Sequence, residues 1–135
     1  MISNEAPPRR SVTRLAAVDA LALVVFVVAG IRSHHEVGAV DLFLRNAIPL
    51  LSAWFVVAAA TGAYRRPGLR TLVITWVVAV PAGLAARSLW VGSPTGTRLV
   101  VFLGVGLVFT ALFLSVGRSL ARLAGRRVLT VEPRT

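Results

Sequence analysis

Residues 99–116 of this chain read LVVFLGVGLVFTALFLSV and contain no charged side chain. A helix needs ~20 mainly apolar residues to cross the ~30 Å hydrocarbon core of a bilayer. With its interfacial flanks, this stretch therefore predicts a membrane-spanning helix. Three further stretches have nearly the same length and character: Leu15–Ile31, Ala47–Ala63 and Thr71–Ala86. We predict an all-α, polytopic membrane protein with four transmembrane helices.

The composition predicts a single membrane domain. Of the 135 residues, 56% are hydrophobic and only 15% are charged, below the ~25% usual for soluble domains, and the mean hydropathy is +0.79. Leu15–Ile31 is too long for a signal-peptide core and lacks a cleavage pattern, so we expect it to be retained. The predicted segments are a disordered cytoplasmic tail over 1–12, a transmembrane domain over 13–127 and a second tail over 128–135. The predicted helices cover about 14–31, 42–63, 70–90 and 98–117, the last with a cytoplasmic extension to about 127.

Charge predicts the orientation in the membrane. All fifteen basic residues are arginines; eleven flank one side of the predicted spans, and Arg32, Arg45, Arg87 and Arg98 lie on or near the other. Because cytoplasmic loops carry the Lys/Arg excess, both termini should be cytoplasmic in the cell (inner or plasma) membrane. Short connectors predict an antiparallel four-helix bundle. The net charge of +10 is distributed by the membrane, so we expect no nucleic-acid partner.

Several cytoplasmic arginines are predicted to contact lipid headgroups. Arg118, Arg122 and Arg126 recur every four residues after the last span, and Arg65 and Arg66 lie in the turn between the second and third spans. Basic residues next to a membrane surface gain ~1 kcal/mol each from anionic lipid. The predicted partners are thus the lipid bilayer and, through helix association, a second copy or a larger membrane protein.

Polar residues gather at the opposite, outer ends of the helices. This outer polar cluster comprises Arg32, Ser33, His34, Glu36, Asp41, Arg45 and Arg87. Asp41 and Arg45 are four residues apart and can pair on one helical face. The cluster is either a salt-bridged cap or a site where arginines bind a small anionic or polar ligand.

Metal binding and catalysis are not predicted. Adjacent His34 and His35 point apart on a helix, and the chain has no second pair of ligands at metal-binding spacing. Ser33, His34 and Glu36 have the residue types of a hydrolytic triad, but neighbours in sequence seldom form one. We expect no metal, no cofactor and no enzymatic activity.

Asp19 is an acid inside the first predicted span, where ionisable groups are costly. Three interpretations remain open. It is a structural carboxylate that binds Thr61, Thr71 or a nearby arginine, a group that handles protons or cations, or a group exposed at the interface. Elsewhere, Gly83 is expected to let a neighbouring helix approach closely.

Three segments resemble a known family. They are Gly30-Ile31-Arg32-Ser33-His34-His35-Glu36, Ala63-Tyr64-Arg65-Arg66-Pro67, and the Pro81 to Arg87 pairing in the third span. Over about residues 13–127 the chain resembles the prokaryotic membrane family catalogued as domain of unknown function 3054. The resemblance implies a four-helix integral membrane protein and no known activity.

Two function hypotheses follow. The first is a structural or accessory membrane component that acts by helix–helix association. The alternative is a transporter or channel subunit for a small polar or anionic solute, which uses the outer arginines. Transport predicts polar side chains that face one continuous cavity through the bundle or along an oligomer axis. The accessory hypothesis predicts a dry, closed bundle that turns a small-residue face, such as Ala111 and Ser115, to lipid.

Overall fold

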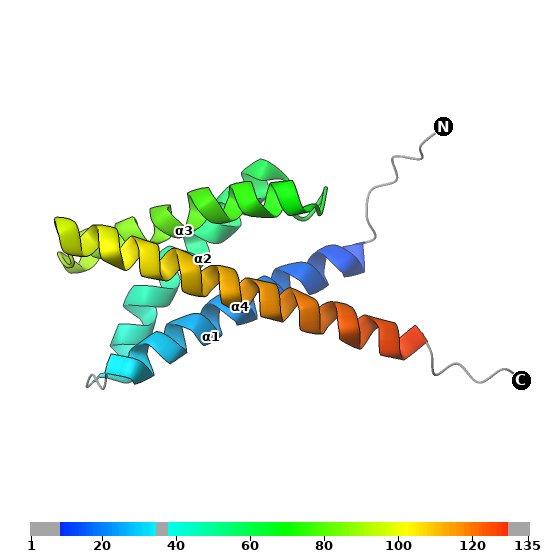
Figure 1. Cartoon of the computed structure of the whole chain (residues 1–135), viewed down its shortest axis with the longest axis horizontal. Coiled ribbons are helices and arrows are strands. Elements are labelled where there is room, and N and C mark those ends of the chain that lie inside the picture. Colours follow the sequence, from blue (N-terminus) through cyan, green and yellow to red (C-terminus); the bar gives the residue numbers. More distant parts are fainter. Residues whose placement is uncertain (1–8, 35–37, 130–135) are drawn as a thin grey trace, which may run out of the picture.

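The computed structural model describes residues 9–34 and 38–129. They form four α-helices: α1 (Arg9–His34), α2 (Ala39–Thr61), α3 (Leu69–Val91) and α4 (Thr97–Leu129) (Figure 1). No described residue lies in a strand, which confirms the all-α prediction. Each helix is long and apolar enough to cross a membrane.

All four helices are longer than predicted, α1 and α4 by the most. α1 begins at Arg9, so residues 9–12 are helical and the prediction of a disordered tail is wrong for them. α4 continues to Leu129 because its last turns are rich in helix-forming leucine, alanine and arginine and contain no proline. The predicted tails over 1–8 and 130–135 lie outside the described residues.

α2 ends at Thr61 because Gly62 adopts a left-handed backbone conformation with φ 70°. The amide of Gly62 donates to the carbonyl of Ala59 (3.3 Å), and that of Ala63 donates to Ala58 (3.0 Å). This glycine cap satisfies carbonyls that the helix end would leave free. The glycine also starts the turn over residues 62–65, which contains Tyr64.

Each helix packs against two others. α1 contacts α2 and α4, and α3 contacts α2 and α4. Within the described residues, α1 makes no close backbone contact with α3, nor α2 with α4. The helices therefore surround a common core, whose fully buried side chains include Leu23, Leu50, Trp54 and Val80.

α2 and α3 approach closely at Gly83. A Cβ atom at this position would lie 2.8 Å from the Cα of Leu50 and 3.1 Å from the carbonyl oxygen of Pro49. Only a residue without a side chain fits there, which confirms that Gly83 permits close helix approach. Pro49 and Pro81 lie inside α2 and α3 without ending either helix.

α1 and α4 are in contact and cross each other at an angle (Figure 1). Arg14 of α1 donates from Nη2 to the carbonyl of Ala121 (2.8 Å). Further along α1, the rings of Phe26 and Phe113 meet edge to face with centroids 6.2 Å apart. Between these two contacts, Gly117 lies against Ala22.

Candidate functional site

One face of α4 runs through the core from end to end. It is made of residues four apart, which occupy successive turns of the same helical face. All but the first are buried, and the first is half-buried: Phe102, Gly106, Thr110, Leu114 and Arg118. The face has a different chemistry at its two ends, with an aromatic ring at one and a guanidinium group at the other.

A cavity of about 310 Å³ lies at the Phe102 end of the bundle. Residues from all four helices and from the turn between α3 and α4 form its walls. Most of the lining is aliphatic or aromatic, and the polar side chains are those of Asn46, Arg87 and Ser93. We call this space the Arg87 cavity; its lining is Phe26, Val27, Gly30, Ile31, Leu42, Asn46, Leu50, Leu84, Arg87, Ser93, Pro94 and Phe102.

Arg87 is held in place at the wall of this cavity. Its Nε donates to Oδ1 of Asn46 (3.0 Å), and its Nη1 donates to the carbonyl of Ser93 (2.6 Å). The guanidinium carbon lies 5.3 Å from the ring centroid of Phe102, within the range of a cation–π interaction. Three partners from three segments therefore orient one planar group that suits carboxylate, sulfonate and phosphate oxygens.

Among the described members of the predicted outer polar cluster, only Arg87 lies in the lining of this cavity. Asp41 and Arg45 pair as predicted, with Nε 2.9 Å from Oδ2, but both side chains are exposed. Arg32 is exposed, and the hydroxyl of Ser33 donates to the carbonyl of Gly30 (2.7 Å). The side chain of His34 and all of Glu36 lie outside what the structure describes.

Sequence reasoning missed Asn46 and Phe102 as partners of Arg87. Asn46 is an uncharged amide inside a predicted span, one turn before Leu50, and that position was a signal for an inward-facing polar contact. Phe102 gave no such signal, because a phenylalanine in a transmembrane helix usually faces lipid or core.

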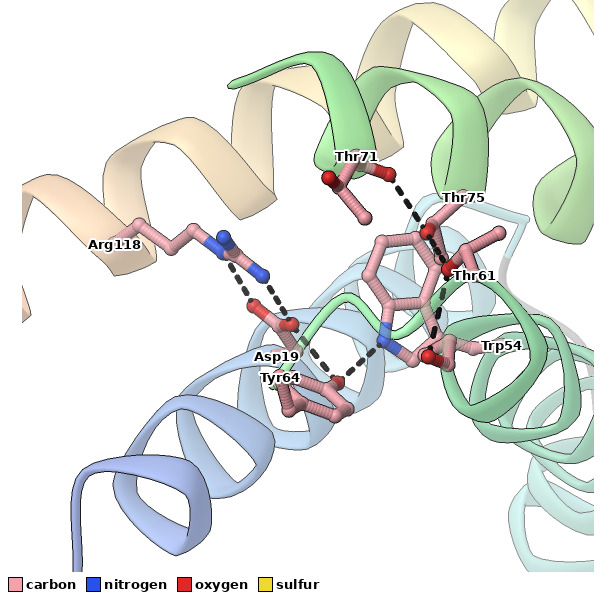
Figure 2. Close-up of polar contacts among 8 residues, drawn as sticks. Asp19, Trp54, Thr61, Tyr64, Thr71, Thr75 and Arg118 are labelled. Carbon is pink, nitrogen blue, oxygen red and sulfur yellow. Dashed lines mark hydrogen bonds and ion pairs between the residues drawn. The ribbon is translucent and has the colours of Figure 1, made fainter. Parts of the chain in front are cut away.

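A second polar group lies at the Arg118 end of the bundle. Asp19 is fully buried and Arg118 is 8% exposed. Nε of Arg118 donates to Oδ1 of Asp19 (2.8 Å) and Nη2 donates to Oδ2 (2.7 Å) (Figure 2). Two parallel hydrogen bonds between opposite charges make a strong, directional link between α1 and α4.

Tyr64 and Trp54 extend this ion pair to α2 and its following turn. The hydroxyl of Tyr64 donates to Oδ2 of Asp19 (3.0 Å), and Nε1 of Trp54 donates to that hydroxyl (2.9 Å) (Figure 2). We call these four side chains the Asp19 network. Burial raises the pKa of Tyr64, and the negative charge of Asp19 raises it further, so the phenol stays protonated and keeps donating.

The partners predicted for Asp19 need one correction. Thr61 and Thr71 do not bind it: Thr61 lies 2.7 Å from the hydroxyl of Thr75, which donates to the carbonyl of Thr71 (2.8 Å) (Figure 2). The nearby-arginine alternative is the one the structure contains, through Arg118. Among the described residues, no buried side-chain nitrogen or oxygen lacks a hydrogen bond.

The prediction that Arg118 contacts lipid headgroups is wrong. Arg118 lies one turn after Leu114 on the inward face of α4, so its side chain meets Asp19 instead of the membrane surface. Arg65, Arg66, Arg122 and Arg126 are exposed, and their contact with headgroups stays a prediction. The described residues hold no group of three or more His, Cys, Asp or Glu side chains placed to bind a metal ion.

Four helices, each long and apolar enough to span a bilayer, with a buried ion pair in the core, define a four-helix class of membrane-compatible proteins. A family model described as "Protein of unknown function (DUF3054)" matches residues 16–121, and the chain belongs to this family. This confirms the resemblance seen in the sequence. No curated protein and no solved structure matches the chain.

Proposed function

We propose that the chain is an antiparallel four-helix bundle in the cell membrane with both termini in the cytoplasm. Along their contact, Arg14, Ala22 and Phe26 of α1 meet Ala121, Gly117 and Phe113 of α4, so residue numbers run in opposite directions. The arginine excess flanks the Asp19 end, which supports a cytoplasmic position for that end. The Arg87 cavity then lies towards the outside.

We propose further that the protein binds a small organic anion in the Arg87 cavity, as a transporter subunit for such a solute. The observation that carries this proposal is a guanidinium group fixed at the wall of a mainly apolar cavity. Binding sites for small molecules are concave, largely apolar and carry a few well-placed polar groups. Because Asn46 and Ser93 already orient Arg87, a ligand does not have to order that side chain.

The lining indicates an anion with an apolar body, not an inorganic ion. A hydrated inorganic anion would leave water against Phe26, Val27 and Leu84, whereas an aromatic or branched aliphatic body displaces that water. The volume of about 310 Å³ is at the small end of the ~300–1,000 Å³ range of ligand pockets. A ligand with one acidic group on a small ring system or a short branched chain fits both the apolar lining and the cavity volume.

Binding of 2-naphthalenesulfonate, a permanently charged anion with an apolar ring system, tests this proposal. Calorimetry on the purified protein in detergent micelles should show saturable binding. Arg87→Gln should weaken it at least about tenfold, the equivalent of ~1.4 kcal/mol. The control Arg98→Gln removes an exposed arginine near the same end of the bundle and should bind like the wild type.

An uncharged ligand provides a second control: naphthalene-2-sulfonamide should bind the wild type and Arg87→Gln equally. Equal binding of the sulfonate to all three proteins would refute the site.

The accessory hypothesis remains a second candidate, favoured by the outward face of α4. Gly104 has open space where a Cβ would lie, and Val105, Val108 and Leu112 are at least half exposed. A second copy packing there would place Val108 near its symmetry mate. Because the chain has no cysteine, Val108→Cys should then form a disulfide-linked dimer in native membranes, and Val77→Cys on α3 serves as the exposed control. Equal crosslinking of the two variants would argue against association through α4.

A further inference from the structure

The Arg87 cavity and the Asp19 network lie at opposite ends of the same inward faces. On α1, Val27 lines the cavity, Leu23 lies one turn away and Asp19 one turn further. Eight residues of α-helix separate the first from the last, ~12 Å at 1.5 Å per residue. The inward face of α4 likewise extends from the cavity, at Phe102, to the network, at Arg118.

α2 repeats the pattern with its own residues. Asn46 and Leu50 line the cavity, and Trp54, two turns after Asn46, belongs to the network. Between the two ends the core is mainly apolar. Its almost fully buried apolar side chains are Leu23, Leu50, Val80, Leu84 and Leu114. The buried hydroxyl of Thr110 lies among them, donates to the carbonyl of Gly106 (2.7 Å) and accepts from Nε1 of Trp76 (3.1 Å). We call these buried side chains the plug. The plug and then the Asp19 network separate a ligand in the cavity from the other side of the membrane.

The Asp19 network joins the segments that must separate for that plug to open. Asp19 belongs to α1, Arg118 to α4, and Tyr64 to the turn that connects α2 with α3. Breaking these contacts removes the ion pair between α1 and α4, and the hydrogen bond between α1 and the turn that joins α2 to α3. Tyr64 and Trp54 keep the carboxylate oriented while the end is closed.

An ion pair suits a closure that has to open. A buried pair gains little net stability over apolar side chains, because taking both charges out of water offsets much of their attraction. When the end opens into a water-filled vestibule, the carboxylate and the guanidinium regain their hydration. Leucine side chains at the same positions would instead be exposed to water on opening.

We infer that the protein moves its ligand across the membrane, with the Arg87 cavity as the outward-facing binding site and the Asp19 network as the closed cytoplasmic gate. This inference rests on the proposed function, which names a transporter subunit with a binding site but no gate. Opening at the gate must accompany closing at the cavity, since a passage open at both ends would leak the ligand and other solutes.

Thiol accessibility tests the gate without any ligand. The chain has no cysteine, so single reporters can be placed at Ala22, buried between α1 and α4 next to the gate, and at Leu42 in the cavity wall. A membrane-impermeant maleimide is applied from the cytoplasmic side to Ala22→Cys, and from the outer side to Leu42→Cys. Adding Asp19→Asn should raise labelling of the first at least about tenfold and lower labelling of the second.

The expected rise in labelling at Ala22→Cys and fall at Leu42→Cys distinguish a gate from a merely structural contact. Loss of stability alone would raise labelling of both reporters, and that result would overturn the inference, as would unchanged labelling of either reporter. Arg122→Gln provides the matched control, because it removes an exposed arginine one turn after Arg118. It should leave both reporters unchanged, and reporter changes equal to those of Asp19→Asn would also overturn the inference.

A reversible lock provides a second test that keeps Asp19 intact. A Cβ at Gly117 would lie 3.4 Å from the Cβ of Ala22, close to the ~3.5–4.5 Å separation of a disulfide. In liposomes, oxidised Ala22→Cys/Gly117→Cys should still bind 2-naphthalenesulfonate but no longer carry it across the bilayer, and reduction should restore the flux. Flux that persists in the oxidised protein would refute the gate and leave the binding proposal standing. Absence of probe binding to the wild type would instead refute the proposed function.

Discussion

Asp19 and Arg118 are the two charged residues that the described part of the chain buries. Each is a charge buried in a membrane-compatible core, and each satisfies the other through two hydrogen bonds. Replacing a buried pair by apolar residues of similar volume is often neutral, whereas removing one partner leaves an uncompensated charge. The two residues should therefore behave as a unit.

We expect Asp19→Asn to lower the free energy of unfolding by about 3–5 kcal/mol, because the guanidinium of Arg118 loses its counter-charge while it stays buried. The double variant Asp19→Leu/Arg118→Met should lose much less. Reversible unfolding in mixed micelles measures both. Equal losses for the single and the double variant would show that the pair does not act as a unit.

Tyr64 offers a pH-dependent test, since it is the only tyrosine in the chain. Burial and the charge of Asp19 raise its pKa in the folded protein, whereas the unfolded chain should titrate near the ordinary value of about 10. Below that pH both states are neutral at this residue. Above it, the unfolded state ionises first, so stability falls as pH rises.

The tyrosinate absorbance in micelles follows this titration directly. The folded protein should show little ionisation at the pH where a free tyrosine is half ionised. Asp19→Asn should move the midpoint of Tyr64 downward, because the neighbouring negative charge is gone. A midpoint at the ordinary value in the folded wild type would contradict the buried position of the phenol.

At the scale of the helices, glycine decides how closely the elements pack. Gly83 allows the backbones of α2 and α3 to touch beneath Arg87, and Gly106 accommodates the side chain of Leu84 at the contact of α3 with α4. Small residues are used in this way between membrane helices, where backbone proximity replaces the hydrophobic effect as a source of attraction. These contacts set the width of the bundle at the floor of the Arg87 cavity.

Gly83→Ala should destabilise the protein by about 1–3 kcal/mol, because its Cβ would lie 2.8 Å from the Cα of Leu50. Gly104→Ala is the matched control, since nothing lies within 4 Å of its Cβ position in the same kind of helix. It should be neutral, or more stable by up to about 1 kcal/mol. Unfolding of the two variants under identical micelle conditions decides between them. Similar stabilities would show that α2 and α3 can move apart to accommodate the added methyl group at little cost in free energy.

At the scale of the whole molecule, the ring of four helices separates two chemistries along one axis. The Arg87 cavity lies at one end and the Asp19 network at the other, with an apolar plug between them. The proposed orientation assigns the arginine-rich end to the cytoplasm. Solute binding and gating both depend on that assignment.

Two exposed turns test the orientation. Thr95→Cys lies in the turn between α3 and α4, and Gly68→Cys in the turn between α2 and α3, where an extended φ of −151° accepts a side chain. An impermeant maleimide should label Thr95→Cys on intact cells, and Gly68→Cys only after permeabilisation. The reverse pattern would place the Arg87 cavity on the cytoplasmic side.

The positions of the helices could be predicted closely from the sequence, whereas the contacts of the candidate site could not. Spans centred on Leu23 or Leu107 were visible because crossing a bilayer requires a continuous apolar run, which is a local property. The pairing of Asp41 with Arg45 was also local, one turn apart on α2. The partners of Arg87 were not predicted, since Asn46 is 41 residues away.

The amino-acid sequence by itself determined that this protein has four apolar helices and belongs to its family, because the demands of a bilayer and the family's short motifs are written in neighbouring residues. Only the tertiary structure decided which polar groups meet. Asp19 and Arg118 are 99 positions apart, and their encounter depends on which faces of α1 and α4 are turned together. That choice brings the two buried charges together, and no local stretch of the chain contains it.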